Sequence, residues 1–530
     1  MKSLYREGIR VIFGLPGVQL YHAMDALYDE PGIRFITTRH EQATAYMADG
    51  FSRAGGGIGT ALMVPGPGLL NAAAAIGTAY SASSPILVLS GQIERDMIGV
   101  NRGMLHEVDD QIDCIAPITK WAKRILDPAE VPDAVHEAFF HLKTGRPRPV
   151  EIEIPPETLA EIAQVELREP EEYTRPVGTA EQIQQAAQTL SQATSPLIWA
   201  GGGVISSVAS EALVRVAEHL QAPVVTTAEG RGAISDHHHL SLGGLMLRND
   251  PLGEARFGHD VILAVGTRLA TPHFLGGQRV IQIDIDPEEL GRNYENTMGI
   301  HGDARSSLEE LHKALSAAAP ARPEDKEAIN KLKELRAESS IRVEPQDSLI
   351  AAVRSAMPDD GILISGMTQL GYYSRTYFPV YQPQSFLTSS YFGNLGYAYP
   401  TALGAKVAQP DKAVVALSGD GGFLFNSQEL ATAVQHGINA VVVVFNDDAY
   451  GNVLRDQVNR FDGRAIGAEL HNPDFVKLAE AYGARGVRAH GPDELEASLK
   501  EALGIETPTL IEVPVGMMPS PFERGLGNPR

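Results

Sequence analysis

The sequence has a single cysteine, Cys114, in 530 residues. One thiol cannot form an intramolecular disulfide, and no charged-then-apolar signal segment follows Met1, so we expect the reducing cytoplasm as the compartment. The sequence also lacks any stretch that approaches the roughly 20 strongly apolar residues of a membrane span. The nearest stretch, Leu69–Leu89, is mostly Ala, Gly and Ser and contains Pro85, and we expect a buried helix followed by a strand there.

Positive charge is also scarce. Lys and Arg number 44 against 66 Asp and Glu, which leaves a formal net charge of −22. Neutralising phosphates requires clustered Lys and Arg, so this balance argues against nucleic acids and anionic membranes as partners. With 43% hydrophobic and 21% charged residues, the composition is that of an ordinary globular protein. At roughly 150 residues per domain, the length predicts about three domains, each large enough to fold without disulfides or structural metals.

The apolar runs are short, β-branched and bounded by Gly, Pro or Asp, and longer helix-like stretches separate them. This pattern is typical of parallel strands in α/β units, so we expect an α/β fold throughout the chain. The predicted strands are Arg10–Phe13, Ile86–Ser90, Pro149–Ile154, Leu197–Ala200, Val261–Val265, Val280–Ile285, Gly361–Ile364, Val414–Leu417 and Ala440–Phe445.

Two segments have the composition of connectors between domains. Pro155–Gly178 is dense in Pro and Glu, and Ala317–Pro345 mixes Ala, Pro, Lys and Glu, with a surface helix expected at Glu324–Ala337. No short-period repeat is present, which argues against solenoids and propellers. The connectors divide the chain into three domains, for which we expect the limits 1–160, 180–317 and 345–520.

The strongest chemical signal lies in the third domain. The predicted strand Val414–Leu417 runs into Gly419–Gly422, and the next strand ends in Asn446–Gly451, which reads Asn-Asp-Asp-Ala-Tyr-Gly. Both polar loops therefore follow the carboxyl ends of strands, where open α/β sheets bind ligands. Glycines around Asp420 allow the backbone to approach a phosphate, and a carboxylate with a second oxygen ligand suits Mg²⁺. Together the loops predict a metal–diphosphate site, whereas a Gly-Asp-Gly alone is more often a plain turn.

A second candidate is Glu41, in the segment Thr38–Ala43. It follows the strand-like Arg34–Thr37 and precedes the helix-like Ala43–Arg53. Taken alone, a glutamate that opens a helix is usually a solvated carboxylate, favourably placed by the helix dipole. Whether Glu41 has a function can be judged only together with the metal–diphosphate motif of the third domain.

The two motifs resemble the signature of thiamine-diphosphate-dependent enzymes, in which Gly-Asp-Gly is followed some 27 residues later by Asn-Asn or Asn-Asp before Tyr-Gly. The resemblance implies three doubly wound parallel-sheet domains: a pyrimidine-binding, a central and a diphosphate-binding domain, in chain order. Further similarity covers almost the whole chain and points to the acetolactate synthase and 2-oxo acid decarboxylase branch. The segments that carry it are Phe13–Gly17, Val64–Asn71, Pro85–Gln92, Asp260–Gly266, Gln282–Pro287, Gly302–Ala304 and Ser389–Ala405.

In the family's pattern, the cation is held by Asp420, by Asp447 and by the backbone carbonyl of Ala449. Asp447 stands where many relatives have Asn, which keeps an oxygen ligand and adds negative charge, so Mg²⁺ binding should be retained. The resemblance places Glu41 on a ring nitrogen of the cofactor's aminopyrimidine, where it promotes loss of the thiazolium proton. Leu395 would be the apolar wedge beneath the bent cofactor. The other cofactor-binding residues that the resemblance implies are Pro16, Gly66, Asn71, Gly393, Gly419, Gly421, Gly422, Tyr450 and Gly451.

The resemblance also implies a homodimer or homotetramer. Family members build each site from the pyrimidine domain of one chain and the diphosphate domain of another, so Glu41 should meet Asp420 across a subunit interface. A monomer should then be inactive. Some relatives bind FAD or ADP in the central domain, and the sequence predicts neither here.

Substrate choice is less well specified. In acetolactate synthases the loop that corresponds to Leu105–Glu107 commonly reads Phe-Gln-Glu. In pyruvate decarboxylases a nearby loop carries a pair of histidines. This chain has one histidine there, His106. A histidine with a pKa near 6.5 could donate a proton or orient a substrate carboxylate, although an exposed or structurally satisfied histidine is the usual case. Gln19 and His22 lie three residues apart and would share a face if that segment were helical.

Two departures from the family's patterns limit the assignment. Acetolactate synthases usually have a Trp near Asp456, which this chain lacks. Pyruvate decarboxylases have a Glu near Val453 and an Asp at Val18, and both are missing here. We therefore expect decarboxylation and carboligation of 2-oxo acids of the acetolactate synthase type. The alternatives are simple decarboxylation to an aldehyde, cleavage or ligation of an unusual acyl substrate, and a non-enzymatic scaffold.

Overall fold

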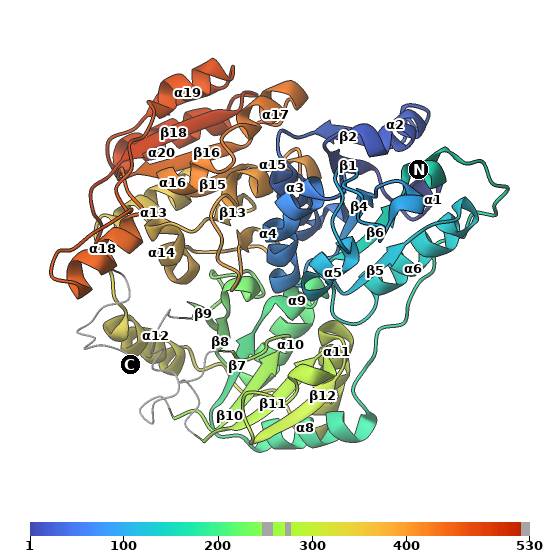
Figure 1. Cartoon of the computed structure of the whole chain (residues 1–530). Helices are drawn as coiled ribbons and strands as arrows, with labels where there is room; N and C mark the ends of the chain where they lie inside the picture. The colour runs from blue at the N-terminus through green and yellow to red at the C-terminus, as the bar shows by residue number, and fades with distance from the viewer. Residues whose placement is uncertain (246–257, 271–276, 521–530) are drawn as a thin grey trace.

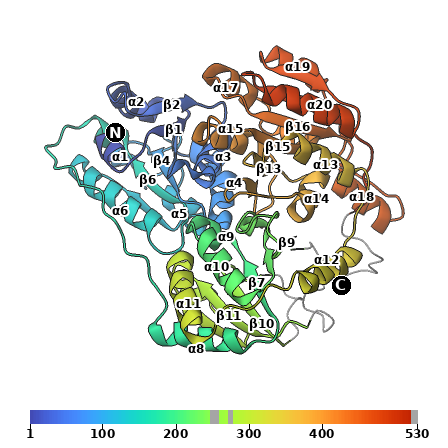
Figure 2. The same ribbon diagram turned by 180° about the vertical axis from the view of Figure 1, so that it is seen from behind.

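The computed structural model describes residues 1–245, 258–270 and 277–520, and it contains three six-stranded sheets (Figure 1). In all three sheets every strand pairing is parallel, and helices flank the sheets. The α/β fold with three doubly wound parallel-sheet domains is therefore confirmed. The view from behind shows the same three bodies, with the central domain below the other two (Figure 2).

The first sheet has the strand order β2-β1-β3-β4-β6-β5. Its strands are β1 (Val11–Gly14), β2 (Arg34–Thr37), β3 (Gly59–Met63), β4 (Ile86–Gly91), β5 (Trp121–Arg124) and β6 (Val150–Ile154). Its helices are α1 (Lys2–Arg6), α2 (Tyr21–Tyr28), α3 (Glu41–Phe51), α4 (Pro67–Ala82), α5 (Gln111–Ile115), α6 (Val131–Lys143) and α7 (Pro156–Ala160). The helix and strand expected within Leu69–Leu89 are α4 and β4.

The central sheet has the order β12-β11-β10-β7-β8-β9. Its strands are β7 (Pro196–Ala200), β8 (Val224–Thr226), β9 (Ser241–Gly244), β10 (Val261–Val265), β11 (Arg279–Asp284) and β12 (Thr297–His301). The helices are α8 (Ala180–Gln192), α9 (Gly202–Ser206), α10 (Ser210–Leu220) and α11 (Ala304–Ala318). The connector before α8 contains the short helix α7 and then runs along the outside of the molecule (Figure 1). The second connector contains the expected helix, α12 (Lys326–Ser339).

The third sheet has the order β14-β13-β15-β16-β18-β17. Its strands are β13 (Ile362–Ser365), β14 (Phe386–Thr388), β15 (Val414–Gly419), β16 (Val441–Asn446), β17 (Arg485–Arg488) and β18 (Thr509–Pro514). The helices are α13 (Gln346–Ala356), α14 (Gln369–Tyr377), α15 (Ala398–Ala408), α16 (Asp420–Leu424), α17 (Glu429–His436), α18 (Gly451–Arg460), α19 (Phe475–Ala481) and α20 (Pro492–Leu503).

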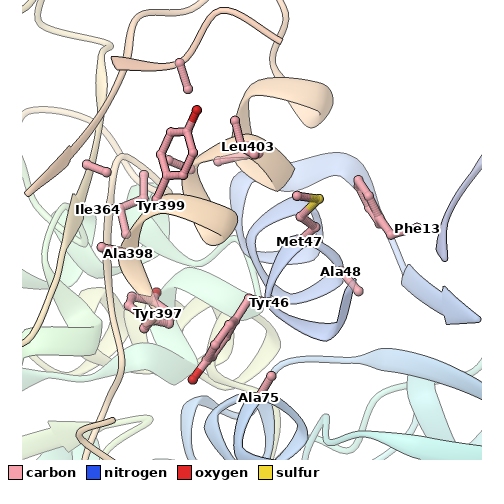
Figure 3. Packing of buried hydrophobic residues seen from close by; sticks show 14 of the residues in the cluster. Phe13, Tyr46, Met47, Ala48, Ala75, Ile364, Tyr397, Ala398, Tyr399 and Leu403 are labelled. Atoms are coloured by element: carbon pink, nitrogen blue, oxygen red, sulfur yellow. The ribbon is translucent and has the colours of Figure 1, made fainter. Parts of the chain in front are cut away.

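Helices α3 and α15 pack against each other and join the first domain to the third (Figure 3). Their backbones approach closely because both contribute glycines: a methyl group on Gly50 would overlap the carbonyl of Thr401, and one on Gly404 would overlap the carbonyl of Met47. The helices share one continuous buried apolar cluster that spans both domains. Since α3 begins at Glu41, this cluster fixes the helix that carries the candidate catalytic carboxylate.

All three domains meet at Arg53, just after α3. Its guanidinium donates to Glu229 Oε2 of the central domain at 2.6 Å and to the carbonyl of Thr388 of the third domain at 2.7 Å. Arg53 and Glu229 are largely buried, which shields their charges from solvent screening. The contact holds the central domain against the other two.

Candidate active site

The two polar loops of the third domain lie side by side. Strands β15 and β16 are neighbours in the sheet, and their carboxyl ends lead into Asp420 and Asp447. Asp420 is only 2% exposed; its Oδ1 accepts the N–H of Gly421 at 2.8 Å, and its Oδ2 accepts the N–H of Ala449 at 3.3 Å. Burial, and then the nearby charge of Asp420, raises the pKa of Asp447 to about 7. The fold therefore brings the two carboxylates so close that the charge of Asp420 disfavours ionisation of Asp447.

This donor set fits a hard divalent cation. It combines the carboxylates of Asp420 and Asp447 with the backbone of Ala449, all oxygen donors of the kind that Mg²⁺ prefers. Within the ranges that the structure covers, no group of three or more His, Cys, Asp and Glu side chains is arranged to hold a metal. A cation here would complete its shell with water and ligand phosphate oxygens, as Mg²⁺ commonly does. Its charge would also relieve the repulsion between the two carboxylates.

Glycines shape the wall of this site. A methyl group on Gly421 would lie 2.6 Å from the ring of Tyr450, and one on Gly451 would overlap Oδ2 of Asp447. At Gly422 the nearest side-chain atoms are farther away, 3.5 Å for Ser418 and 3.7 Å for Leu395, and at Gly419 the nearest is Thr368 Oγ1 at 3.3 Å. Side chains at Gly421 and Gly451 would therefore clash, and the glycines of this turn place no side chain between its backbone and a phosphate.

Leu395 lies beside that turn, although it belongs to the segment before α15. It is partly exposed, which distinguishes it from an ordinary core leucine. Gly393, two residues earlier, has a φ of 66°, a backbone conformation that favours glycine. The predicted wedge and the predicted diphosphate turn therefore meet in the structure.

Asn472 was missed by sequence reasoning. Its Nδ2 donates to Oδ2 of Asp420 at 2.6 Å, to Oδ1 of Asn446 at 2.9 Å and to Oδ1 of Asp448 at 3.1 Å. One amide thus links three side chains of the acidic loops. It lies in the segment between α18 and α19, away from any strand end, so no local pattern marks it.

In the first domain, Glu41 is the first residue of α3, which follows β2. Glu41 is 7% exposed, and its Oε2 accepts a hydrogen bond from Nδ2 of Asn71 on α4 at 3.1 Å. The ring of His40 caps the helix by accepting the N–H of Gln42 at 3.1 Å. The structure thus brings together Glu41 and Asn71, two residues that the resemblance assigned to the cofactor.

The start of α3 is docked on the third domain of the same chain. The N–H of Arg39 donates to both carboxylate oxygens of Glu429, and Nδ2 of Asn426 donates to Gln42 at 3.1 Å. Burial raises the pKa of Glu429 to about 7. Asn426 and Glu429 were not predicted as site residues, because their partners are almost 400 residues away in the sequence.

His106 lies in a loop of the first domain, between β4 and α5. The residue has a φ of 74°, and its Nδ1 lies 3.1 Å from Oε1 of Gln19, while Nε2 of Gln19 donates to the carbonyl of Leu105 at 3.2 Å. Because the Gln19 amide nitrogen is directed at a carbonyl, its oxygen faces His106 and accepts a hydrogen bond from Nδ1–H. In the neutral imidazole, Nε2 is then the basic nitrogen.

The same corner contains Gly66 and Pro16. Gly66 has a φ of 54°, and a methyl group on it would overlap the carbonyl of His106. Pro16 lies in the turn after β1, next to Leu15, whose N–H donates to the carbonyl of Leu62 at 3.1 Å. The turn that follows β1 and the loop that follows β3 therefore lie side by side at the carboxyl edge of the first sheet.

Three of the candidate substrate residues, Val18, His22 and Val453, are on the surface of the chain. Val18 is 53% exposed and His22 is also exposed, whereas Gln19 between them is buried. Gln19 belongs to a 3-10 turn, Val18–Leu20, and α2 begins only at Tyr21, so the three-residue spacing does not place Gln19 and His22 on one helical face. Val453, on α18 of the third domain, is 49% exposed.

Comparison with known proteins gives matches in all three domains. Residues 1–114 match the family described as "Thiamine pyrophosphate enzyme, N-terminal TPP binding domain", residues 183–311 match its "central domain" and residues 366–513 its "C-terminal TPP binding domain". The chain belongs to the thiamine pyrophosphate enzyme family. Thiamine pyrophosphate, another name for thiamine diphosphate, is thus its cofactor, and both matched cofactor-binding domains contain the predicted motifs.

Curated relatives of this thiamine pyrophosphate enzyme extend along nearly its whole length. The "Probable acetolactate synthase large subunit" of Methanocaldococcus jannaschii is 37% identical over 97% of this chain and 90% of the relative. The "Probable 2-ketoarginine decarboxylase AruI" of Pseudomonas aeruginosa is 36% identical over 97% of this chain and 92% of the relative. The "Acetolactate synthase isozyme 3 large subunit" of Escherichia coli is 32% identical over 95% and 91%. The resemblance to acetolactate synthase large subunits is confirmed, and the chain is an enzyme of the transferase or lyase type.

Among the residues that the structure describes, no helix is both long enough and apolar enough to cross a membrane.

Proposed function

We propose that this enzyme decarboxylates a 2-oxo acid and joins the remaining acyl unit to the carbonyl of a second substrate, in the manner of an acetolactate synthase. The main support is that Glu41, the acidic pair and Leu395 occur together in a chain similar over its whole length to acetolactate synthase large subunits. A non-enzymatic scaffold would have no physical need for all of these residues.

A second candidate is decarboxylation with release of an aldehyde. It is favoured by the 36% identical relative named as a probable 2-ketoarginine decarboxylase. Pyruvate decarboxylases, which form aldehydes, have an Asp at the position of Val18 and a Glu near Val453, and these positions are apolar here. We therefore place carboligation first.

We propose that Asp420, Asp447 and the carbonyl of Ala449 hold Mg²⁺, and that the backbone of Gly419–Gly422 holds the cofactor's diphosphate. When bound, thiamine diphosphate supplies a carbon nucleophile and an electron sink for the loss of CO₂. Leu395 supports the cofactor from below. Asp420 and Asp447 follow the neighbouring strands β15 and β16, and a rigid sheet that holds both carboxylates would lower the entropic cost of assembling the site.

The first-domain residues handle protons in this proposal. With the cofactor bound, Glu41 would face a ring nitrogen of the aminopyrimidine and would exchange a proton with it, and Asn71 would keep the carboxylate in that orientation through its 3.1 Å hydrogen bond. His106 presents Nε2 to the substrate, because Gln19 occupies its Nδ1. A neutral imidazole can accept a proton at Nε2, and an imidazolium can donate one there.

We also propose that the active enzyme is a homodimer or homotetramer in which each site joins the first domain of one chain to the third domain of another. Both domains expose large apolar side chains close in sequence to the site motifs, which argues for a covered surface. These are Val18, Tyr21, Leu70 and Leu105 in the first domain and Tyr391, Phe392, Phe425 and Val453 in the third. The proposed domain limits are 1–160, 180–317 and 345–520.

The function is tested in two steps. Calorimetric titration with thiamine diphosphate and Mg²⁺ should give saturable binding that chelation of Mg²⁺ abolishes. CO₂ release is then measured on a panel of 2-oxo acids with apolar and guanidinium side chains, and the products are identified by NMR. A hydroxyketone product supports carboligation, whereas an aldehyde as sole product assigns the second candidate. Failure to bind the cofactor would contradict both.

A further inference from the structure

Gln111 lies at the start of α5, completely enclosed beneath the loop that carries Gly66. Its Oε1 accepts the N–H of Gly66 at 2.8 Å. Its Nε2 donates to Oγ of Ser90 at 3.0 Å, to the carbonyl of Gly91 at 3.0 Å and to Oε2 of Glu153 at 2.7 Å. One buried amide therefore connects the Gly66 loop to the carboxyl ends of β4 and β6.

Below Gln111 lies a buried acidic floor formed by Glu151 and Glu153, two residues apart on β6 and both fully buried. Ser90 donates to Oε1 of Glu151 at 2.5 Å, and Gln92 donates to Oε1 of Glu153 at 3.2 Å. Burial, and then the charge of Glu153, raises the pKa of Glu151 well above its ordinary value. The charge of Glu153 thus disfavours ionisation of its neighbour.

That charge is compensated from one side by Arg124 on β5. Its guanidinium contacts Glu153 and also lies 3.3 Å from Oδ1 of Asp110. Asp110 caps α5 by accepting the N–H groups of Ile112 and Asp113. Arg124 therefore fixes both the partner of Gln111 and the helix from which Gln111 extends, and the side chain has little freedom to move.

Above Gln111, the Gly66 loop connects directly to the proposed catalytic groups. Helix α4 starts at Pro67, and its Asn71 donates to Glu41. A methyl group on Gly68 would lie 3.5 Å from Oε1 of Glu41, and Gly66 packs against the carbonyl of His106. The backbone position of Gly66 therefore sets where α4 begins, and with it the surroundings of Glu41 and His106.

An apolar side chain would be the simpler filling for such a position. Burying a polar side chain costs free energy unless its hydrogen bonds are made, and both the oxygen and the nitrogen of the Gln111 amide have partners. The network lies at the edge of the first sheet that faces the proposed site. Its directional bonds specify a backbone position that apolar packing alone would leave adjustable.

We infer that Gln111 is a positioning residue of this enzyme: together with Ser90 and Glu153 it fixes the Gly66 loop and thereby orients Asn71, Glu41 and His106. This inference rests on the proposed function, because the orientation of Asn71, Glu41 and His106 matters only if these residues act on the cofactor and the substrate. It adds to the proposed site a buried network that supports Gly66 from behind.

The test compares Gln111→Met, which keeps the length of the side chain but removes its hydrogen bonds, with the exchanged pair Gln111→Glu/Glu153→Gln. The exchanged pair keeps an acceptor for the N–H of Gly66 and a hydrogen bond between positions 111 and 153, but it lacks the donors to Ser90 and to the carbonyl of Gly91, so it isolates the bond to Gly66. In the cofactor-free proteins, amide hydrogen–deuterium exchange of residues 64–71 is followed by mass spectrometry. We expect exchange about tenfold faster in Gln111→Met and near the wild-type rate in the exchanged pair.

Gln282→Met is the matched control. Gln282 is equally buried, in the central sheet; it accepts the N–H of Gly291 at 2.9 Å and donates to the carbonyls of Thr267 and Glu289. The Gln282→Met protein should lose stability as Gln111→Met does, but the amide exchange rate of its residues 64–71 should stay at the wild-type value. With cofactor bound, Gln111→Met should also slow deuterium exchange at the thiazolium carbon about tenfold, while Gln282→Met should not.

Unchanged amide exchange in Gln111→Met, or equal slowing at the thiazolium carbon in Gln282→Met, would overturn the positioning role. If Gln111→Met does not fold, the exchanged pair decides. A tenfold slowing of exchange at the thiazolium carbon in that pair would contradict a role that depends on the bond to Gly66. A rate near that of the wild type would support it. Absence of cofactor-dependent exchange in the wild type would instead contradict the proposed function, so the two failures are distinguishable.

Discussion

Glu41→Gln should leave the fold and the affinity for thiamine diphosphate nearly unchanged, but it should slow proton exchange at the thiazolium carbon by about 10²–10⁴-fold. The amide keeps the shape of the side chain and can still meet Asn71, so packing at the start of α3 is preserved. What it cannot do is take up and return a proton. The measurement is NMR-detected hydrogen–deuterium exchange at that carbon in the bound cofactor.

The control for this substitution is Glu289→Gln, which neutralises another buried glutamate, in the central domain, where it pairs with Arg146. It should affect stability and leave the exchange rate as in the wild type. Exchange at the wild-type rate in Glu41→Gln would show that the carboxylate has no part in the proton transfer.

Asp420→Ala should weaken binding of both Mg²⁺ and thiamine diphosphate by about 3 kcal/mol, which is roughly a hundredfold. The substitution removes a proposed cation ligand and leaves the N–H groups of Gly421 and Ala449 without their acceptor. Excess Mg²⁺ should restore little, because the lost group is a ligand and not merely a source of negative potential. Calorimetric titration over a range of Mg²⁺ concentrations measures both effects.

Asp448→Asn provides the comparison for Asp420→Ala. Asp448 is exposed and has a φ of 50°, a conformation that Asn tolerates, so the substitution removes one charge from the same loop without backbone strain. We expect cofactor affinity within about twofold of the wild type. A loss equal to that of Asp420→Ala would mean that net charge, and not a specific ligand, governs binding.

The sequence predicted most of the strands inside the sheets, because these strands are buried on both faces and read as uninterrupted apolar runs; β3 and β18, which also lie inside their sheets, were not predicted. Val261–Val265 coincides with β10, and Val414–Leu417 lies within β15. Several shorter or edge strands were not predicted. β17 begins and ends with Arg and is only half-buried, and β14 has three residues, so neither has the apolar pattern of a central strand.

The candidate site shows the same division. Asp420 and Asp447 follow strands that are neighbours in the sheet, so their proximity could be inferred from strand positions and the glycine pattern. Gln111 and Asn472 could not be found in this way. Each acts on a partner more than 40 residues away, and each lies in a short helix or irregular segment whose position depends on the complete fold.

The central claim is that Glu41 and Asp420 serve one cofactor from two different chains. It is tested by co-expressing Glu41→Gln and Asp420→Ala chains with different tags and purifying the mixed oligomer on both tags. In each mixed pair of chains, one site carries both substitutions and the other carries neither. The account predicts that CO₂ release recovers to about half of the wild-type rate per pair. Activity no higher than that of the two separate variants would contradict it.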